Sequence, residues 1–135
     1  MGVKLKDKVA IVTGSCRGMG RDIALAYAEE GADVVLTSRT AGDLDGVARE
    51  IRALGRKALP VPCDVRSEEQ LDLMVKRTLD AFGKIDVMVA SAGGSFNTLF
   101  RNMWEQPLKD WQLLLDINLT GAWLCLKAVA PARAR

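Results

Sequence analysis

The sequence predicts an α/β fold with a doubly wound parallel sheet, and three observations lead to that prediction. Short apolar runs rich in β-branched residues alternate with longer segments whose apolar residues recur every three or four positions. Four such runs alternate with helical patterns of ten or more residues, as in right-handed strand–helix–strand units. A glycine-rich stretch follows the first run. Ligands of such sheets bind at the carboxyl ends of the strands, so we expect the functional residues there.

The four expected strands are apolar and are bounded by glycine, proline or charged residues: residues 9–12, 33–38, 58–63 and 85–90. Pro60 and Pro62 lack N–H groups, so the third strand is expected at an edge of the sheet. Helices are expected at residues 18–30, 44–54 and 67–82, and from about residue 107 onward. Ser67 and Gln70 form a capping box at the third helix, and glycine follows each of the first three helices.

Composition narrows the possible functions. The 135 residues are 49% hydrophobic and 27% charged, which is typical of about one globular domain. Nineteen basic against 17 acidic residues give no electrostatic reason to expect a nucleic acid or a membrane surface as partner. The absence of histidine excludes imidazole catalysis and histidine-ligated zinc. Three cysteines without C-x-x-C spacing indicate reduced thiols and no metal site.

The apolar stretches of the sequence are short. None approaches the ~18 consecutive residues that a membrane span requires. The four apolar residues after the first charged cluster are too few for the core of a secretory signal. We therefore expect a soluble, cytoplasmic protein.

The segment 13–20, Thr-Gly-Ser-Cys-Arg-Gly-Met-Gly, is the first candidate binding site. Glycines at a strand–helix turn allow positive φ and let the backbone approach a pyrophosphate, and the helix amino terminus favours phosphate. A tight turn without a ligand is the alternative, but the strand–turn–helix context favours binding. The expected cofactor-binding residues here are Gly14, Ser15, Cys16, Arg17, Gly18, Met19 and Gly20.

The Thr-Gly-x-x-x-Gly-x-Gly spacing resembles that of the short-chain dehydrogenase/reductase family, and the resemblance continues along essentially the whole chain. Asp64 and Val65 follow the third expected strand, where the family's aspartate binds the adenine amino group. Ser91, Ala92 and Gly93 stand where the family has Asn-Asn-Ala-Gly. Because both family asparagines are missing, cofactor contacts at this segment are expected mainly from the backbone.

The resemblance implies a Rossmann fold, with residues 1–135 as an incomplete NAD(P)-binding domain. The motifs are nearest to reductases of 3-oxoacyl thioesters and to sugar or polyol dehydrogenases such as glucose dehydrogenase. The implied reaction is hydride transfer between NADP(H) and a carbonyl or alcohol, a small-molecule substrate. The resemblance also implies a homo-oligomer, a dimer or tetramer, that pairs through the last helix.

The end of the second expected strand indicates which coenzyme binds. No carboxylate stands there to bind a ribose 2′-hydroxyl, because Asp33 opens the strand and Asp43 comes too late. Arg39, next to Ser38, offers a planar fork to a 2′-phosphate, and Arg17 adds a second positive charge. We therefore expect NADP in preference to NAD, the alternative being that both arginines are solvated surface charges.

One polar residue interrupts an apolar stripe on the last helix. The stripe consists of Trp111, Leu114, Leu115, Asn118, Ala122, Cys125, Leu126 and Val129. A buried amide must find partners, so we expect Asn118 to face inward and to bond to backbone or water. The residue matches the family's helix asparagine, which holds a local helix distortion and a water of the proton relay. Asn118 is therefore the expected catalytic residue, with a purely structural role as the alternative.

The family's catalytic Tyr-x-x-x-Lys pair is not found in this sequence. The single tyrosine is Tyr27, and Gly31 stands four residues later. We expect this chain to supply the cofactor-binding half of a longer domain. Its fourth strand would then expose an edge that recruits other chains, which predicts poor solubility or oligomers. The alternative is a catalytically inactive nucleotide-binding or oligomerisation module.

Overall fold

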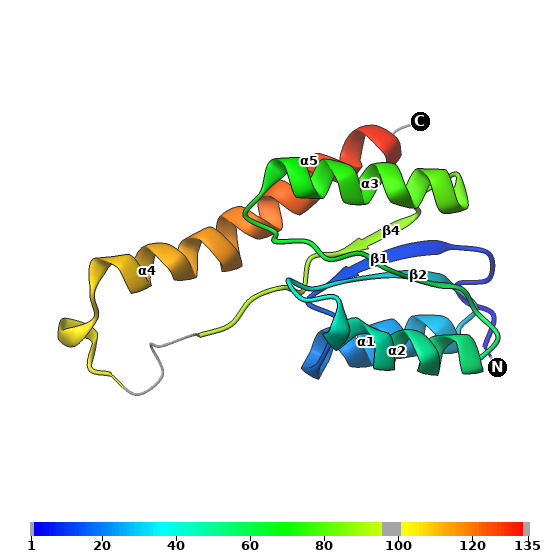
Figure 1. The fold of residues 1–135 in the computed structure, drawn as a ribbon, viewed down its shortest axis with the longest axis horizontal. Coiled ribbons are helices and arrows are strands. Elements are labelled where there is room, and N and C mark those ends of the chain that lie inside the picture. The colour runs from blue at the N-terminus through cyan, green and yellow to red at the C-terminus, as the bar shows by residue number, and fades with distance from the viewer. Residues whose placement is uncertain (1, 96–100, 134–135) are drawn as a thin grey trace.

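The sheet has four parallel strands and is covered by helices on both faces. The computed structural model describes residues 2–95 and 101–133. Within them the strands are β1 (Val9–Thr13), β2 (Asp33–Thr37), β3 (Ala58–Pro60) and β4 (Val87–Val89), in the order β3-β2-β1-β4. Helices α1 (Gly18–Glu29) and α2 (Gly42–Ala53) lie below the sheet in Figure 1, and α3 (Glu68–Phe82) lies above it. The predicted doubly wound parallel fold is confirmed.

Alternating side chains of the two central strands divide the core into two halves. Ile11 and Val35, paired across β1 and β2, pack into the cluster under α3 and the last helix. Val12, Val34 and Leu36 pack into the cluster under α1 and α2. Both strands are buried on both faces, which explains their continuous apolar sequence.

The outer strands are shorter than expected. β3 ends at Pro60 instead of residue 63, and β4 spans three residues instead of residues 85–90. Proline cannot donate to a ladder, and β3 does lie at an edge of the sheet. The chain beyond β3 still follows β2, since the N–H of Val61 donates to Leu36 O at 2.8 Å and that of Cys63 to Ser38 O at 2.8 Å.

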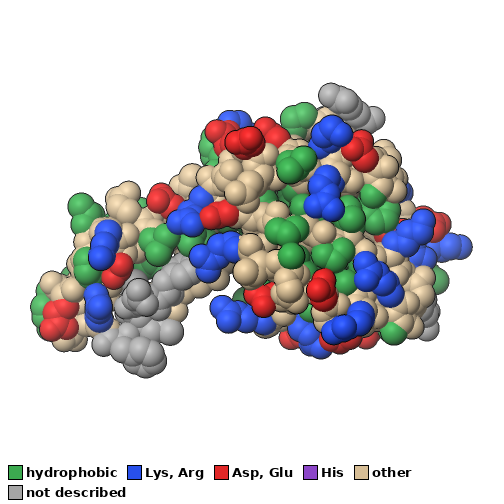
Figure 2. All heavy atoms as spheres, in the orientation of Figure 1, with side chains coloured by type: hydrophobic (Ala, Val, Ile, Leu, Met, Phe, Trp, Pro, Cys, Tyr) green, Lys and Arg blue, Asp and Glu red, His purple; other side chains and the backbone are tan. Residues whose placement is uncertain are grey.

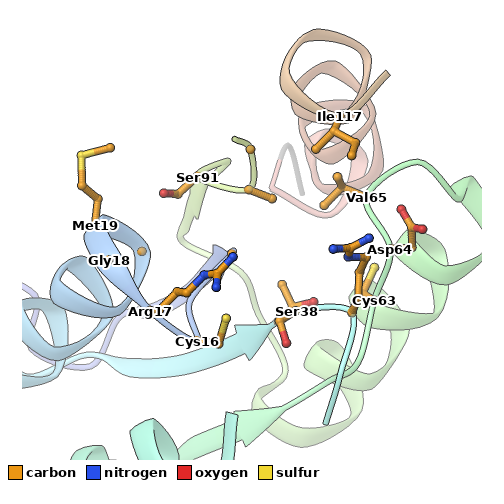
Figure 3. A pocket seen from close by; sticks show the side chains of 16 residues that line it. Cys16, Arg17, Gly18, Met19, Ser38, Cys63, Asp64, Val65, Ser91 and Ile117 are labelled. Carbon is orange, nitrogen blue, oxygen red and sulfur yellow. The ribbon is translucent and has the colours of Figure 1, made fainter. Parts of the chain in front are cut away.

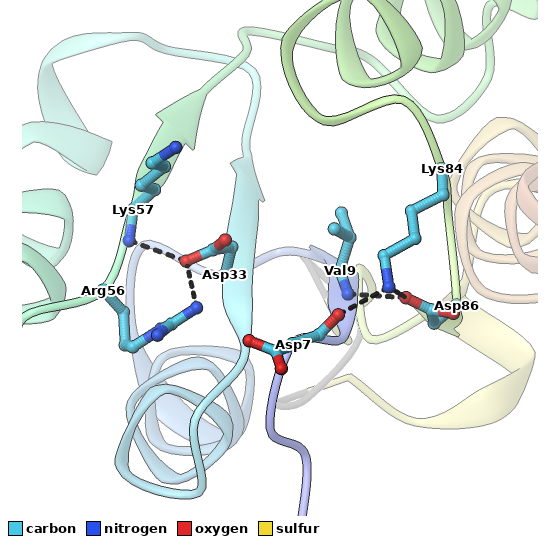
Figure 4. A network of polar contacts seen from close by, with 7 residues as sticks. All are labelled: Asp7, Val9, Asp33, Arg56, Lys57, Lys84 and Asp86. Carbon is cyan, nitrogen blue, oxygen red and sulfur yellow. Dashed lines mark hydrogen bonds and ion pairs between the residues drawn. The ribbon is translucent and has the colours of Figure 1, made fainter.

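Carboxylates hold the amino ends of the strands (Figure 4). Asp86 accepts a hydrogen bond from the N–H of Val9 at 2.9 Å and pairs with Lys84 at 3.1 Å. Burial alone would raise the pKa of Asp86, but the Val9 hydrogen bond and the Lys84 ammonium outweigh it and lower that pKa. Asp33 pairs with Arg56 at 2.9 Å at the start of β2. Structural ion pairs thus occupy the end of the sheet where the strands begin. The other end, where the strands stop, remains open to a ligand.

The last helical segment changes its winding halfway. It consists of α4 (Leu108–Leu115), a π-helical turn (Asp116–Thr120) and α5 (Gly121–Arg133). α5 packs on α3, where Lys127 Nζ pairs with Glu68 Oε1 at 2.6 Å, whereas α4 extends away from the body of the molecule (Figure 1). The family resemblance had implied a local distortion of this helix, and the π turn lies at that place.

The apolar stripe predicted for this helix is wrong at three of its positions. Trp111 is 54% exposed, Leu126 is 53% exposed and Asn118 is exposed. Cys125 and Val129 are buried as predicted, and the other buried residues of the segment are Ile117, Gly121 and Leu124. A π turn holds one residue more than an α turn, so it rotates the buried face by roughly 100° relative to a regular helix.

The same segment is also apolar on average. Leu108–Arg133 is 26 residues long, with a mean hydropathy of 1.5 in its most apolar window, and by these two criteria it is long and apolar enough to cross a membrane. Asp116 and Lys127 interrupt the segment, so it contains no uninterrupted apolar run of the length that the sequence analysis considered. A core helix passes the same test, and Ile117, Leu124 and Val129 of this segment do lie in the core.

Candidate functional site

A cavity of about 330 Å³ opens at the carboxyl ends of β1, β2 and β4. Figure 3 shows the glycine loop with Met19 and Ser91 on one side, and Asp64, Val65 and Ile117 on the other. The lining residues are Gly14, Cys16, Arg17, Gly18, Met19, Gly20, Thr37, Ser38, Arg39, Cys63, Asp64, Val65, Ser91, Ala92, Gly93 and Ile117. The structure thus brings together every residue that the sequence nominated for the cofactor except Ser15.

The loop before α1 is packed backbone against backbone. Gly14 has φ +63°, and a Cβ there would lie 2.8 Å from the Cα of Ala92. A Cβ on Gly20 would overlap the carbonyl oxygen of Gly14. Only glycine fits at these two positions, because any side chain would push the loop away from β4 or from α1. The loop therefore presents bare peptide groups and the first turn of α1 to the cavity.

Ser15 anchors this loop instead of lining the cavity. Its side chain is fully buried and accepts a hydrogen bond from the N–H of Thr37 at 3.0 Å. Its own N–H donates to Thr37 O at 3.2 Å. The loop is thereby tied to the end of β2, so Ser15 positions its neighbours.

Thr13 joins the ends of β1 and β4. Its hydroxyl accepts a hydrogen bond from the N–H of Ala92 at 3.0 Å and donates to Val89 O at 3.4 Å. Ser91 and Ala92 replace the asparagines of the family pattern, and the Thr13 hydroxyl adds a side-chain link to the backbone pairing of β1 with β4. This role of Thr13 was not predicted, because in the sequence a threonine that ends a strand before a glycine turn carries no sign of it.

Two arginines face the cavity without a carboxylate partner. Among the residues that the structure describes, neither Arg17 nor Arg39 forms an ion pair. In Figure 3 the Arg17 side chain reaches from the loop toward Ser38. Both arginines also line an adjoining hollow of about 420 Å³ with Cys16, Ser38, Thr40 and Asp43. Arg39 is near enough to Asp64 for its charge to lower the pKa of that carboxyl, but neither guanidinium group is held in an ion pair, so the two together fit an anionic ligand.

Asp64 carries a negative charge on the other side of the cavity. Its carboxylate accepts hydrogen bonds from Arg66 Nη2 at 2.7 Å, Arg66 Nε at 3.0 Å and the N–H of Arg66 at 3.0 Å. The side-chain bond to Arg66 is the main reason that the pKa of Asp64 lies below its usual value. The carboxylate caps the local turn and, as an ionised acceptor with four lone-pair directions, still has capacity for a ligand donor.

Three lining residues, Thr37, Cys63 and Ile117, were not nominated from the sequence. They are almost completely buried, at 1%, 3% and 7% exposure, so their sequence context indicates core packing and gives no sign of a site. Burial raises the pKa of Cys63 to about 11, and that of Cys125 in the same core cluster likewise to about 11. No group of metal-binding side chains occurs within residues 2–95 and 101–133.

Asn118 lies in the π turn, beside the cavity and not in its lining. Its Nδ2 donates to Gly94 O at 2.8 Å and Leu114 O at 3.0 Å, and its Oδ1 accepts from the N–H of Gly94 at 3.0 Å. The expected bonds to backbone are confirmed, whereas the expected inward orientation is wrong. A Cβ on Gly93 would overlap the Asn118 side-chain oxygen, so a larger residue there would displace the amide from its bonds to Gly94.

The fold and the site together define a class of protein. A parallel sheet with a glycine loop before α1 and a cavity at the carboxyl ends of its strands is a Rossmann-type nucleotide-binding fold. A family model described as short chain dehydrogenase matches residues 8–135. The chain belongs to the short-chain dehydrogenase/reductase family, which confirms the resemblance drawn from its motifs.

Three similar proteins illustrate this membership. A 3-oxoacyl-[acyl-carrier-protein] reductase of Synechocystis sp. is 42% identical over 127 residues, 93% of this chain and 50% of the relative. The crystal structure of carveol dehydrogenase from Mycobacterium avium in complex with NAD has a TM-score of 0.90 at 32% identity, covering 98% of this chain and 51% of that one. A metagenomic short-chain oxidoreductase in complex with NADP has a TM-score of 0.86 at 36% identity, covering 95% and 57%. The chain spans about half the length of these relatives.

Proposed function

We propose that this chain binds NADP in preference to NAD and forms the coenzyme-binding part of a carbonyl reductase or alcohol dehydrogenase. The observation that carries the proposal is the cavity in which the glycine loop, two unpaired arginines and Asp64 meet. The relatives support the type of coenzyme and of reaction, because one is named a 3-oxoacyl reductase and solved structures of two others hold NAD or NADP.

Each part of the cavity has a proposed task. The N–H groups of the first turn of α1, near Gly18, hold the pyrophosphate at the positive end of the helix. Arg17 and Arg39 bind the 2′-phosphate, and Asp64 accepts a hydrogen bond from the adenine amino group. Residues 91–93 line the path toward the nicotinamide through their backbone. When bound, the coenzyme supplies or accepts a hydride at nicotinamide C4.

Asn118 is proposed as the residue of this chain nearest to the chemistry. Both of its amide hydrogens are used within the protein, so a water of a proton relay would bond to its oxygen or to the nearby backbone. Its task is therefore to hold the π turn against residues 93–94 and to present an acceptor there.

The coenzyme preference is tested by titration calorimetry with NADP⁺ and NAD⁺. A charge-assisted contact contributes about 1.5–3 kcal/mol, so we expect Arg39→Asp to weaken NADP⁺ binding roughly 10- to 100-fold and NAD⁺ binding much less. Arg49→Asp makes the same charge change on the exposed face of α2 and should leave both affinities near wild type. An unchanged preference in Arg39→Asp would contradict the assignment of NADP, and a chain that binds neither coenzyme would contradict the proposed function.

The alternative function is a nucleotide-binding or oligomerisation module without turnover. The single tyrosine favours it, since Tyr27 lies on α1 with its side chain packed against the core, and Gly31 stands four residues later. Oxidation of NADPH by the chain in the presence of a 3-oxoacyl thioester would contradict this alternative.

Self-association and location are also proposals. An exposed apolar face on the last helix, made by Trp111, Leu119, Trp123 and Leu126, fits pairing with a second copy of the chain. The cysteines Cys16, Cys63 and Cys125 are free, which suits a reducing cytoplasm. The carbonyl or alcohol substrate is a small molecule.

A further inference from the structure

The hollow next to Arg17 and Arg39 also contains the carboxylate of Asp43, a residue that the sequence alone had placed too far beyond the second strand to reach the ribose. We infer that Asp43 is a specificity-determining residue, which opposes a 2′-phosphate and accepts a hydrogen bond from a free 2′-hydroxyl. The inference rests on the proposed coenzyme function and goes beyond it, because the arginines alone would favour NADP strongly. With Asp43 in the same hollow, the chain discriminates less and accepts both coenzymes.

One hydrogen bond holds this carboxylate, and a second fixes the turn that carries its donor. Ser38 Oγ donates to Thr40 O at 2.8 Å, which fixes the turn after β2. Thr40 Oγ1 donates to Asp43 Oδ2 at 2.5 Å. Thr40, Asp43 and Ser38 all line the hollow together with both arginines. The carboxylate is therefore tethered beside the proposed phosphate position instead of turning freely into solvent.

The effect of Asp43 differs between the two coenzymes because of charge. A phosphate monoester carries about −1.5 to −2 charges at pH 7, so it is attracted by the two guanidinium groups and repelled by the carboxylate. A ribose hydroxyl is neutral and donates a hydrogen bond, as Thr40 already does to the same carboxylate. Exposed charges are screened by water, so the repulsion tunes affinity without abolishing binding.

Asp45 provides a matched control. Asp43 and Asp45 both stand in the first turn of α2, where a negative charge stabilises the helix, and both are exposed. Only Asp43 lines the hollow. Neutralising either residue removes one negative charge from the first turn of α2. Asp43 also accepts the Thr40 hydrogen bond, which an asparagine oxygen can still accept, so a difference in the ratio of the two affinities reports the charge beside the ligand.

The test compares adenosine 2′,5′-bisphosphate with AMP, which differ only in the 2′-phosphate, by calorimetry on the full chain. We expect Asp43→Asn to raise the ratio of the two affinities roughly 3- to 10-fold, and Asp45→Asn to leave it unchanged. The rise in this ratio should become smaller as salt is raised from about 0.05 M to about 0.5 M, because salt screens the repulsion between the carboxylate and the phosphate.

The outcomes separate this inference from the function on which it rests. An unchanged ratio in Asp43→Asn, or an equal rise in Asp45→Asn, would overturn the inference while leaving coenzyme binding intact. If wild type bound neither nucleotide, the proposed function itself would fall and the inference with it. Asp43→Ser, which keeps a residue suited to the first turn of a helix, repeats the measurement should the asparagine variant not fold.

Discussion

At the scale of single residues, a few polar side chains connect elements that lie far apart in the sequence. Ser15 ties the glycine loop to β2, Thr13 ties β1 to the segment after β4, and Asn118 ties the π turn to Gly94. Each side chain bonds to backbone groups that regular secondary structure leaves unpaired. The cavity therefore keeps its shape through a few hydroxyl and amide groups that surround it.

Asn118→Ala should destabilise the protein measurably. The variant loses three hydrogen bonds, but the freed backbone groups reach water, so we expect a loss of about 1–2 kcal/mol in the free energy of unfolding. Urea denaturation followed by circular dichroism measures it. Gln112→Ala, an exposed amide on α4, is the control and should stay within about 0.5 kcal/mol of wild type. A loss no larger than that of the control would show that the side chain does not hold the π turn.

The residues of the cavity were predictable where their type is unusual for their place. Glycines at a strand–helix turn and an arginine where an acid is common both stand out in the sequence. Thr37, Cys63 and Ile117 do not stand out, because the same residue types occur at buried positions whether they pack against protein or line a cavity. Only the three-dimensional structure shows which core residues face the open space.

At the element scale, the helices and strands form where periodicity predicts them, and their ends and faces depend on tertiary contacts. Pro60 and Pro62 placed β3 correctly at an edge. The π turn at Asp116–Thr120 has no signal in hydrophobic spacing, so a regular 3.6-residue period assigned Trp111 and Leu126 to the wrong face. The motif match at Asn118, and not the periodicity, indicated a distorted helix.

Because of the ion pairs at the amino ends of the strands, the free energy of unfolding should depend on pH in the acidic range. The pKa of Asp86 is lower in the folded chain than its ordinary value of about 3.9, so its contribution is complete above that value and is lost as the pH falls through the folded pKa. We expect Asp86→Asn to be less stable than wild type by about 1 kcal/mol at pH 7, with the difference vanishing at strongly acidic pH.

The urea midpoints of wild type and Asp86→Asn, measured at several values between pH 7 and about pH 2.5, show how the difference in stability changes with pH. Asp80→Asn is the control, because Asp80 pairs with Lys76 on the exposed surface of α3, where ion pairs contribute little. A difference between wild type and Asp86→Asn that persists undiminished in acid would show that the carboxylate charge is not responsible.

At the scale of the whole molecule, the sheet and its layers form a body from which α4 projects (Figure 1). Figure 2 shows hydrophobic side chains on this projecting arm as well as among the charges of the body. Trp111, Trp123 and Leu126 are all more than half exposed along one helical segment. An apolar face of this kind is unfavourable in water and favours self-association.

Charge on this face should shift the chain toward monomers. Burying one large apolar side chain contributes about 1.5–3 kcal/mol, so Trp123→Glu should weaken self-association tenfold or more. Size-exclusion chromatography with light scattering over a range of concentrations measures it. Leu73→Glu introduces the same charge at an equally exposed leucine of α3 and should not change the mass. A wild-type chain that is monomeric at every concentration would rule out pairing through this face.

The buried thiols of Cys63 and Cys125 can report how often the structure opens. Burial raises the pKa of Cys63 and Cys125 to about 11, so both stay protonated at pH 7, and it also limits the access of reagents to them. An alkylating probe can therefore modify them only during rare opening events of the chain. Their labelling rates record how often the floor of the cavity and the helix above it come apart, and a bound nucleotide that slows Cys63 would reveal its presence without any spectroscopic change of its own.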